Sequence, residues 1–144
     1  MTSVARATIR TDVWDKVYTY LQTTNPISTN NIFSAWNDNL VRDNSYPIVV
    51  IEPPLISFDK FSLNGRFTSH DIKIAIEIYQ NTAETIKSLT DEVTAKLLEG
   101  RETFAGDGLT NLTIEEGDYD TWRDGNKKVH RMTITVSFKT SFQS

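Results

Sequence analysis

Residues 70–79 have the sequence HDIKIAIEIY, in which isoleucine recurs at every second position. The side chains of a β-strand point alternately to its two faces, so this spacing places all the isoleucines on one face. Asp71, Lys73 and Glu77 then share the other face. The stretch predicts a long strand with one buried and one polar face, and therefore a sheet with an apolar layer packed against it.

Three further strands are predicted around this one. Residues 48–51, IVVI, lie between prolines and are typical of a buried strand that begins and ends abruptly. Residues 130–139 alternate apolar and polar side chains over a long run, which indicates a strand with one apolar face. Residues 109–115 alternate less regularly, and a turn-rich stretch around Gly117 and Asp124-Gly125 is expected to separate them from the last strand.

Two amphipathic helices are predicted. Apolar residues recur every fourth position in residues 9–21, and Asn25-Pro26 ends this helix because proline disfavours the helical conformation of its predecessor. A second helix opens near Thr82, and Gly100 stands where a left-handed C-terminal cap is common. The order α-β-β-α-β-β predicts a single α+β domain over residues 1–144, with a mainly antiparallel four-stranded sheet covered on one face by two helices.

The connecting segments are unusually rich in aromatic residues. Residues 55–69, between the first two strands, contain an Asn-Gly pair suited to a tight turn and predict a long loop or an extended β-arm. Residues 23–46 are rich in asparagine and are expected to be mostly irregular, with a short helical turn. Exposed aromatic clusters mark partner surfaces, whereas the same residues folded inward would close the ends of a small core. The candidates for a subunit or partner interface are Phe58, Phe61, Phe67, Phe33 and Trp36.

Motifs for catalysis, cofactors or metals are absent from the sequence. There is no cysteine, no glycine-rich phosphate loop and no nucleophile elbow, and the two histidines, His70 and His130, are far apart along the chain. Acidic residues cluster in residues 115–124 without the regular spacing of a calcium loop, so a solvated loop is expected there. The formal net charge of -4 does not favour nucleic-acid binding, and no apolar stretch approaches the about 18 residues of a membrane span. We therefore expect no enzyme activity, no cofactor and no metal.

The elements also form a familiar series. An N-terminal helix is followed by Tyr46-Pro47-Ile48-Val49-Val50-Ile51, the strand of residues 71–79, a helix opened by Asn81-Thr82-Ala83, and two closing strands. In this order the chain resembles, over nearly its whole length, the tail terminator and tail-completion proteins of long-tailed bacteriophages.

The resemblance implies a structural virion protein of the tail or neck, assembled in the host cytoplasm. Such proteins form a hexameric ring that caps the head-proximal end of the tail tube, ends tube polymerisation and docks the head-tail connector. The implied partners are further copies of the chain, the tail tube protein and the connector or stopper protein, while DNA passes through without specific binding. Asp71, Lys73 and Glu77 are then candidates to face the lumen of the ring.

Two alternatives remain open from the sequence. The first is another ring protein of the neck or of head completion, which differs mainly in its partner. The second is a small cytoplasmic ligand-binding domain or enzyme, with a pocket between helix and sheet that holds His70 or His130 beside carboxylates.

Overall fold

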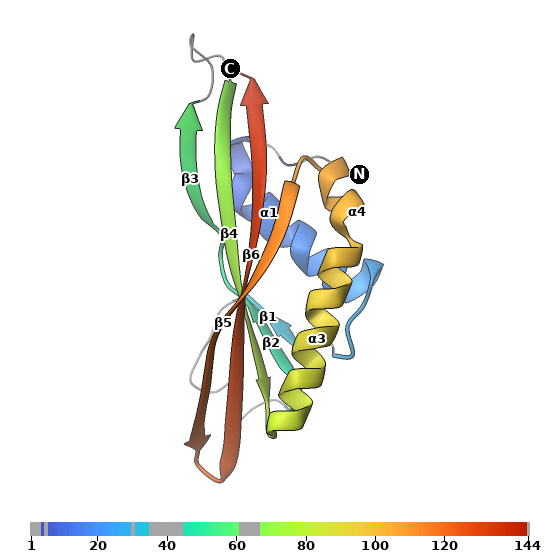
Figure 1. Ribbon diagram of the computed structural model, residues 1–144, viewed down its shortest axis with the longest axis vertical. Coiled ribbons are helices and arrows are strands. Elements are labelled where there is room, and N and C mark those ends of the chain that lie inside the picture. The colour runs from blue at the N-terminus through green and yellow to red at the C-terminus, as the bar shows by residue number, and fades with distance from the viewer. Residues whose placement is uncertain (1–3, 5, 30, 35–44, 61–66, 144) are drawn as a thin grey trace.

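The computed structural model describes residues 4, 6–29, 31–34, 45–60 and 67–143 and has an α+β fold (Figure 1). The helices are η1 (Arg6–Thr8), α1 (Ile9–Thr19), η2 (Tyr20–Thr24), α3 (Ala83–Glu99) and α4 (Arg101–Gly106). The strands are β1 (Ile32–Phe33), β2 (Ile48–Ile51), β3 (Leu55–Lys60), β4 (Phe67–Gln80), β5 (Thr110–Asp124) and β6 (Lys127–Gln143).

The strands form one mixed sheet of six strands in the order β1-β2-β4-β6-β5, with β3 paired to β4 beside β2. Among the described strands, only the pair of β1 and β2 is parallel. The four expected strands are present as β2, β4, β5 and β6, and the sheet contains two strands more than expected. The two additional strands are β1, in the segment expected to be mostly irregular, and β3, in the segment expected to be a long loop or β-arm. β3 pairs with the first half of β4, so the segment after Leu55 extends the sheet as one side of a hairpin.

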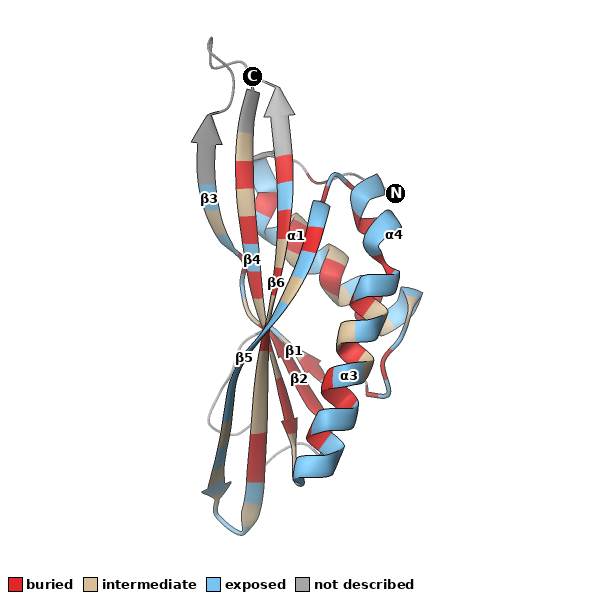
Figure 2. Cartoon of the chain, in the orientation of Figure 1, coloured by how far each residue is buried: buried red, intermediate tan, exposed pale blue. Residues whose placement is uncertain are grey.

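The long strands on which the fold prediction depended are confirmed and are longer than expected. β4 and β6 pair continuously from Phe67 opposite Gln143 to Gln80 opposite His130. The alternating isoleucines of β4, from Ile72 to Ile78, are fully buried and face the helices (Figure 2). Complete burial of an isoleucine side chain is worth about 1.5–3 kcal/mol relative to exposure, so this row supplies a large share of the core.

Helices α1 and α3 cover the same face of the sheet. Val13 and Val17 of α1 and Val93 and Leu97 of α3 are fully buried in one cluster with the β4 isoleucines. The Trp14 indole Nε1 donates a hydrogen bond of 2.7 Å to the Ile51 carbonyl, which ties α1 to β2. The first helix ends near the predicted position, although its last turn, η2, is a π-helix.

Gly100 has a different role from the one expected. Its φ is -84°, so it does not form a left-handed cap, and the chain continues directly into α4. A Cβ at this position would lie 2.5 Å from Cζ of Tyr20. Glycine is therefore required by the close approach of the Tyr20 ring and not by a positive φ.

The turn expected around Gly117 is also absent, because β5 continues through it as a strand of 15 residues. The register between β5 and β6 shifts between Glu116 and Tyr119, which is the mark of a β-bulge. A Cβ on Gly117 would lie 3.1 Å from the Thr133 carbonyl oxygen of β6. The glycine in this stretch therefore marks a bulge within a strand rather than a turn between two strands.

Candidate assembly surface

The face of the sheet opposite the helices, here called the outer face, is mostly polar. It carries the odd-numbered residues of β4 and β6, and the register places Lys73 opposite Ser137 and Glu77 opposite Thr133. Lys73 is exposed, and most of the other polar side chains on these two strands are half-buried. A sheet face of this composition does not form a second large core, so it is available for water or for another macromolecule.

The three candidate lumen residues share this outer face, as their alternation predicts. Asp71 Oδ1 is 3.9 Å from Lys139 Nζ, and the Asp71 side chain is partly buried while that of Lys139 is exposed. Glu77 accepts a hydrogen bond of 2.7 Å from the Tyr79 hydroxyl and forms an ion pair of 3.4 Å with Arg131. The carboxylates are therefore accompanied by cations, and Lys73 is the exposed charge among the three.

An ionic and aromatic cluster, here called the Arg131 cluster, joins β4, β5 and β6 on the outer face. The Arg131 guanidinium pairs with Glu77 and Asp120, and its Cζ lies 5.4 Å from the centre of the Trp122 ring. Trp122 in turn meets Tyr79 edge-to-face, with 6.2 Å between ring centres. Burial, followed by the neighbouring Glu77, raises the pKa of the Tyr79 hydroxyl, so this group stays protonated and donates its hydrogen bond. The members of this cluster become neighbours only through strand pairing, so no local sequence pattern predicts it.

A small second core lies beside the Arg131 cluster. It is made of Ile48, Val50, Tyr79 and Val129, which are at most 1% exposed. Phe33, one of the predicted interface residues, is partly buried against this core. Tyr46 packs there as well and donates a hydrogen bond of 3.1 Å to the Lys128 carbonyl. The β6 side of the β5–β6 hairpin is thereby fixed to β2 and β4.

The other predicted interface aromatics are placed less fully. The backbones of Phe58 and Phe67 lie in paired strands, opposite His70 and Gln143 respectively, while their side chains are outside the described part of the structure. Phe61 and Trp36 lie outside the described residues altogether. An exposed apolar residue that the sequence analysis did not single out is Leu55, which begins β3 and is 74% exposed.

The end of the β5–β6 hairpin, here called the hairpin tip (residues 121–130), projects beyond the end of α3 (Figure 1). Its turn follows Asp124, as predicted, and Gly125 has a φ of 63° there. Arg123 lies directly opposite Lys128 in the ladder, and both side chains are exposed. Like charges in such a pair repel one another, and the tip therefore carries concentrated positive charge.

A hollow of about 230 Å³ lies between α1, η2 and α4. Asp107 is at its inner side, with a side chain that is 5% exposed and an Oδ1 that is 3.6 Å from Lys16 Nζ. Asp12 and Asp15 also line the hollow. Three carboxylates and one ammonium group give it an excess of negative charge.

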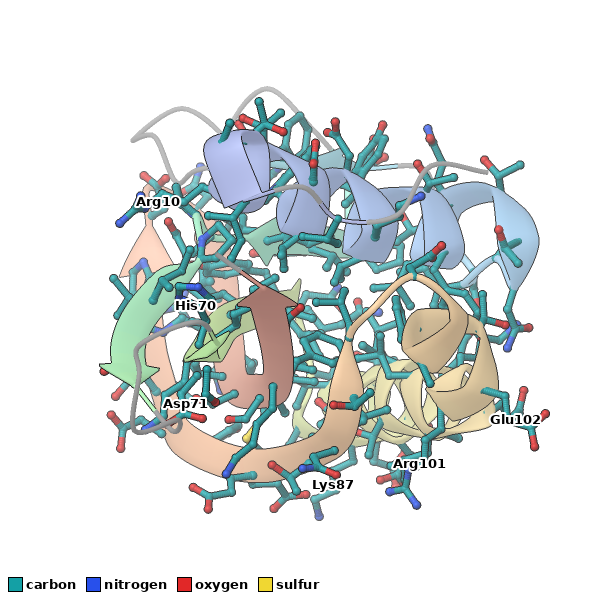
Figure 3. The ribbon with its side chains drawn as sticks, turned by 90° about the horizontal axis from the view of Figure 1, so that it is seen from above. Arg10, His70, Asp71, Lys87, Arg101 and Glu102 are labelled. Atoms are coloured by element: carbon teal, nitrogen blue, oxygen red, sulfur yellow. The ribbon has the colours of Figure 1, made fainter. Side chains whose placement is uncertain are left out.

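The two histidines lie near opposite ends of the long ladder. His70 is opposite Thr140 and His130 is opposite Gln80, a separation of ten strand positions or about 33 Å. Both side chains are buried, and Figure 3 shows His70 towards the side of Asp71 and away from Arg101 and Glu102. The two side chains therefore do not meet in one site.

His130 is hydrogen-bonded through Nδ1 to the Tyr119 hydroxyl. Burial, followed by the nearby Lys128, lowers the pKa of its imidazole. Neither His130 nor His70 lines the hollow between α1, η2 and α4. The ligand-binding alternative expected a pocket that holds a histidine beside carboxylates, and this hollow has the carboxylates without a histidine.

The acidic residues of β5 belong to a strand and not to a loop. Glu115, Glu116 and Asp118 are exposed along this edge strand, whereas Asp120 pairs with Arg131. Over the described ranges, no group of three or more histidine or acidic side chains is arranged to hold a metal ion. Nor does this part of the chain contain a helix long and apolar enough to cross a membrane.

The fold and these surfaces define an α+β protein with a helical face, a polar sheet face and a projecting hairpin. No protein-family model matches the chain, and no curated protein matches it significantly.

Proposed function

We propose that this chain is a structural subunit of a phage tail terminator ring, which caps the head-proximal end of the tail tube and provides the docking surface for the head-tail connector. The observation that carries the proposal is the polar outer face of the sheet, which lies opposite a helical layer. A subunit of a DNA-conducting ring needs one face that tolerates DNA without binding it and another that packs the core.

The charges on the outer face suit this role. Binding to the phosphate backbone requires clustered, unpaired Lys and Arg side chains that displace counterions. Here Lys139 lies near Asp71, and Arg131 is held by Glu77 and a second carboxylate. Paired charges largely cancel at the distance of a passing duplex, so DNA would experience a hydrated and nearly neutral wall.

Ring assembly also needs contacts that repeat with a fixed rotation, which protruding elements and free strand edges can provide. β5 is an edge strand, and the hairpin tip extends past the helical layer. In this proposal the ring has six copies, by resemblance to the terminator family, and the aromatics of residues 55–69 contact a neighbouring subunit or the tube.

The experiment begins with negative-stain electron microscopy of the purified chain, alone and mixed with polymerised tubes of a phage tail tube protein. Rings, or caps at one end of tubes whose length they limit, are the expected result. A chain that neither assembles nor binds tube ends would refute the proposal, and rings that bind only the connector would assign the chain to another position in the neck.

Gold labelling tests the orientation of the subunit in the ring. The chain has no cysteine, so Lys73→Cys on the outer face and Lys87→Cys on α3 each create a single labelling site. Both lysines are exposed, which makes them a matched pair. Gold on position 73 is expected near the ring centre and gold on position 87 near the periphery, whereas the reverse pattern would contradict a lumen lined by the sheet.

A further inference from the structure

The positive charge of the hairpin tip is not neutralised across its own ladder. Arg123 and Lys128 are cross-strand partners, whereas the neighbouring pair of Asp124 and Lys127 combines opposite charges. Both members of the like-charged pair are exposed, and no ion pair of either side chain is found among the described residues. An anionic partner surface would relieve the repulsion between them.

The hollow between α1, η2 and α4 has the complementary charge and a suitable size. Asp15 lies on its α1 side beside Asp12, which accepts a hydrogen bond from Thr8. Among the described lining residues Lys16 is the one cation, and it is paired with the buried Asp107. A volume of about 230 Å³ has room for the end of an arginine or lysine side chain. The concave shape would also exclude part of the solvent, which strengthens charge pairing over that of a flat surface.

The two features lie at different ends of the molecule. The hairpin tip marks one end of the long axis, and α4, which lines the hollow, lies towards the other (Figure 1). A tip therefore cannot reach the hollow of its own chain, but it can reach that of another copy. Contacts between two different surfaces of identical copies are heterologous and form rings or chains rather than closed dimers.

We propose that the hairpin tip of one copy docks over the acidic hollow of the next, so that Arg123 and Lys128 face Asp12 and Asp15 across the subunit contact. This inference rests on the proposed ring function and identifies the surfaces that build the ring. The Arg131 cluster and the second core hold the hairpin rigid, which reduces the conformational entropy lost on docking.

A charge-swap experiment tests the contact. Sedimentation of the purified chain is measured over a wide concentration range for wild type, Arg123→Glu, Asp15→Lys and the combined variant. Each single reversal is expected to weaken self-association about tenfold or more, and the combined variant is expected to recover most of the loss because the pair has only exchanged signs. Raising the salt concentration from about 0.05 M to about 0.5 M is expected to weaken association of the wild type.

Matched controls use α3, which contributes nothing to the hollow. Lys87→Glu and Asp91→Lys make the same changes in net charge at exposed positions and are expected to leave self-association within about twofold of wild type. Thermal unfolding of every variant establishes that a loss of association is not a loss of folding.

Cross-linking provides a second measurement that does not depend on charge. Because the chain lacks cysteine, Arg123→Cys combined with Asp15→Cys places thiols only at the proposed contact. A short bismaleimide is expected to produce a ladder of covalent multimers beyond the dimer. Arg123→Cys combined with Asp91→Cys, in which the second thiol lies on α3, is expected to give none.

Three results would overturn the inference. They are a wild-type chain that stays monomeric at every concentration, association that stops at two copies, and single reversals that act no more strongly than the α3 controls. Tube capping and gold labelling are independent of these variants, so the ring function can survive the loss of this particular contact.

Discussion

Replacing Gly100 with alanine should destabilise the protein, although Gly→Ala within helical segments is usually favourable. The new Cβ would lie 2.5 Å from Tyr20 Cζ and 2.8 Å from the Tyr20 hydroxyl oxygen. Non-bonded carbon atoms prefer a separation of about 3.5–4.0 Å, so the ring would have to move by about 1 Å or more.

The surroundings of Tyr20 oppose that movement. The ring is 5% exposed and packs on Phe104 with 4.9 Å between ring centres, and its hydroxyl accepts a hydrogen bond of 3.1 Å from Asn25 Nδ2. Overpacking a filled core costs about 1–3 kcal/mol. The lower backbone entropy of unfolded alanine returns about 0.4–1 kcal/mol, so the free energy of unfolding should fall by about 1–2 kcal/mol.

Chemical denaturation and thermal unfolding measure this effect, and Tm should fall by about 3–6 °C. Gly106→Ala is the matched control, because Gly106 ends α4 with a negative φ and a Cβ there would meet nothing within 4 Å. It should leave stability unchanged or raise it by up to about 1 kcal/mol. In a double-mutant cycle, Tyr20→Ala should remove most of the Gly100→Ala penalty. Equal stability of Gly100→Ala and wild type would refute the close-approach explanation.

Three other predictions concern separate parts of the fold. Thr82 caps α3 because its side chain accepts a hydrogen bond from the Thr85 backbone amide. In urea titrations Thr82→Ala should lower the free energy of unfolding by about 1 kcal/mol, whereas Thr82→Ser should keep the stability of the wild type. Equal losses for the two variants would contradict the capping role. Arg131→Ala should lower the free energy of unfolding by about 1–3 kcal/mol, because it leaves Glu77, whose side chain is 14% exposed, without its cation. Lys139→Ala removes a 58% exposed partner of Asp71 and should change the free energy of unfolding by less than about 0.5 kcal/mol. Similar effects of the two substitutions would argue against the Arg131 cluster. Burial lowers the pKa of His130 in the folded state below its ordinary value near 6.5. The unfolded chain therefore binds this proton more readily than the folded protein, and the free energy of unfolding should decline as the pH falls through about 6.5. An NMR titration midpoint for His130 at or above 6.5 would overturn this expectation.

The candidate surface could be predicted from the sequence only in part. Alternation alone places Asp71, Lys73 and Glu77 on one strand face, because residues two apart on a strand always share a face. It does not show that Glu77 is held by Arg131, which lies 54 positions later in the chain. The aromatic content of the loops likewise identifies candidates such as Phe33 without revealing that this side chain packs on a second core.

Local periodicity is readable from the sequence: the alternating isoleucines of β4, the helical stripe of α3, and the apolar and polar faces that follow from both. The strand pairing, including β3 beside β4 and the continuation of β5 through Gly117, is visible only in the folded chain. The difference lies in the distance along the chain between the residues that interact. Strand and helix periods depend on neighbouring residues, whereas register, bulges and the hollow beside Asp107 depend on contacts between segments distant in the chain, which local patterns do not encode.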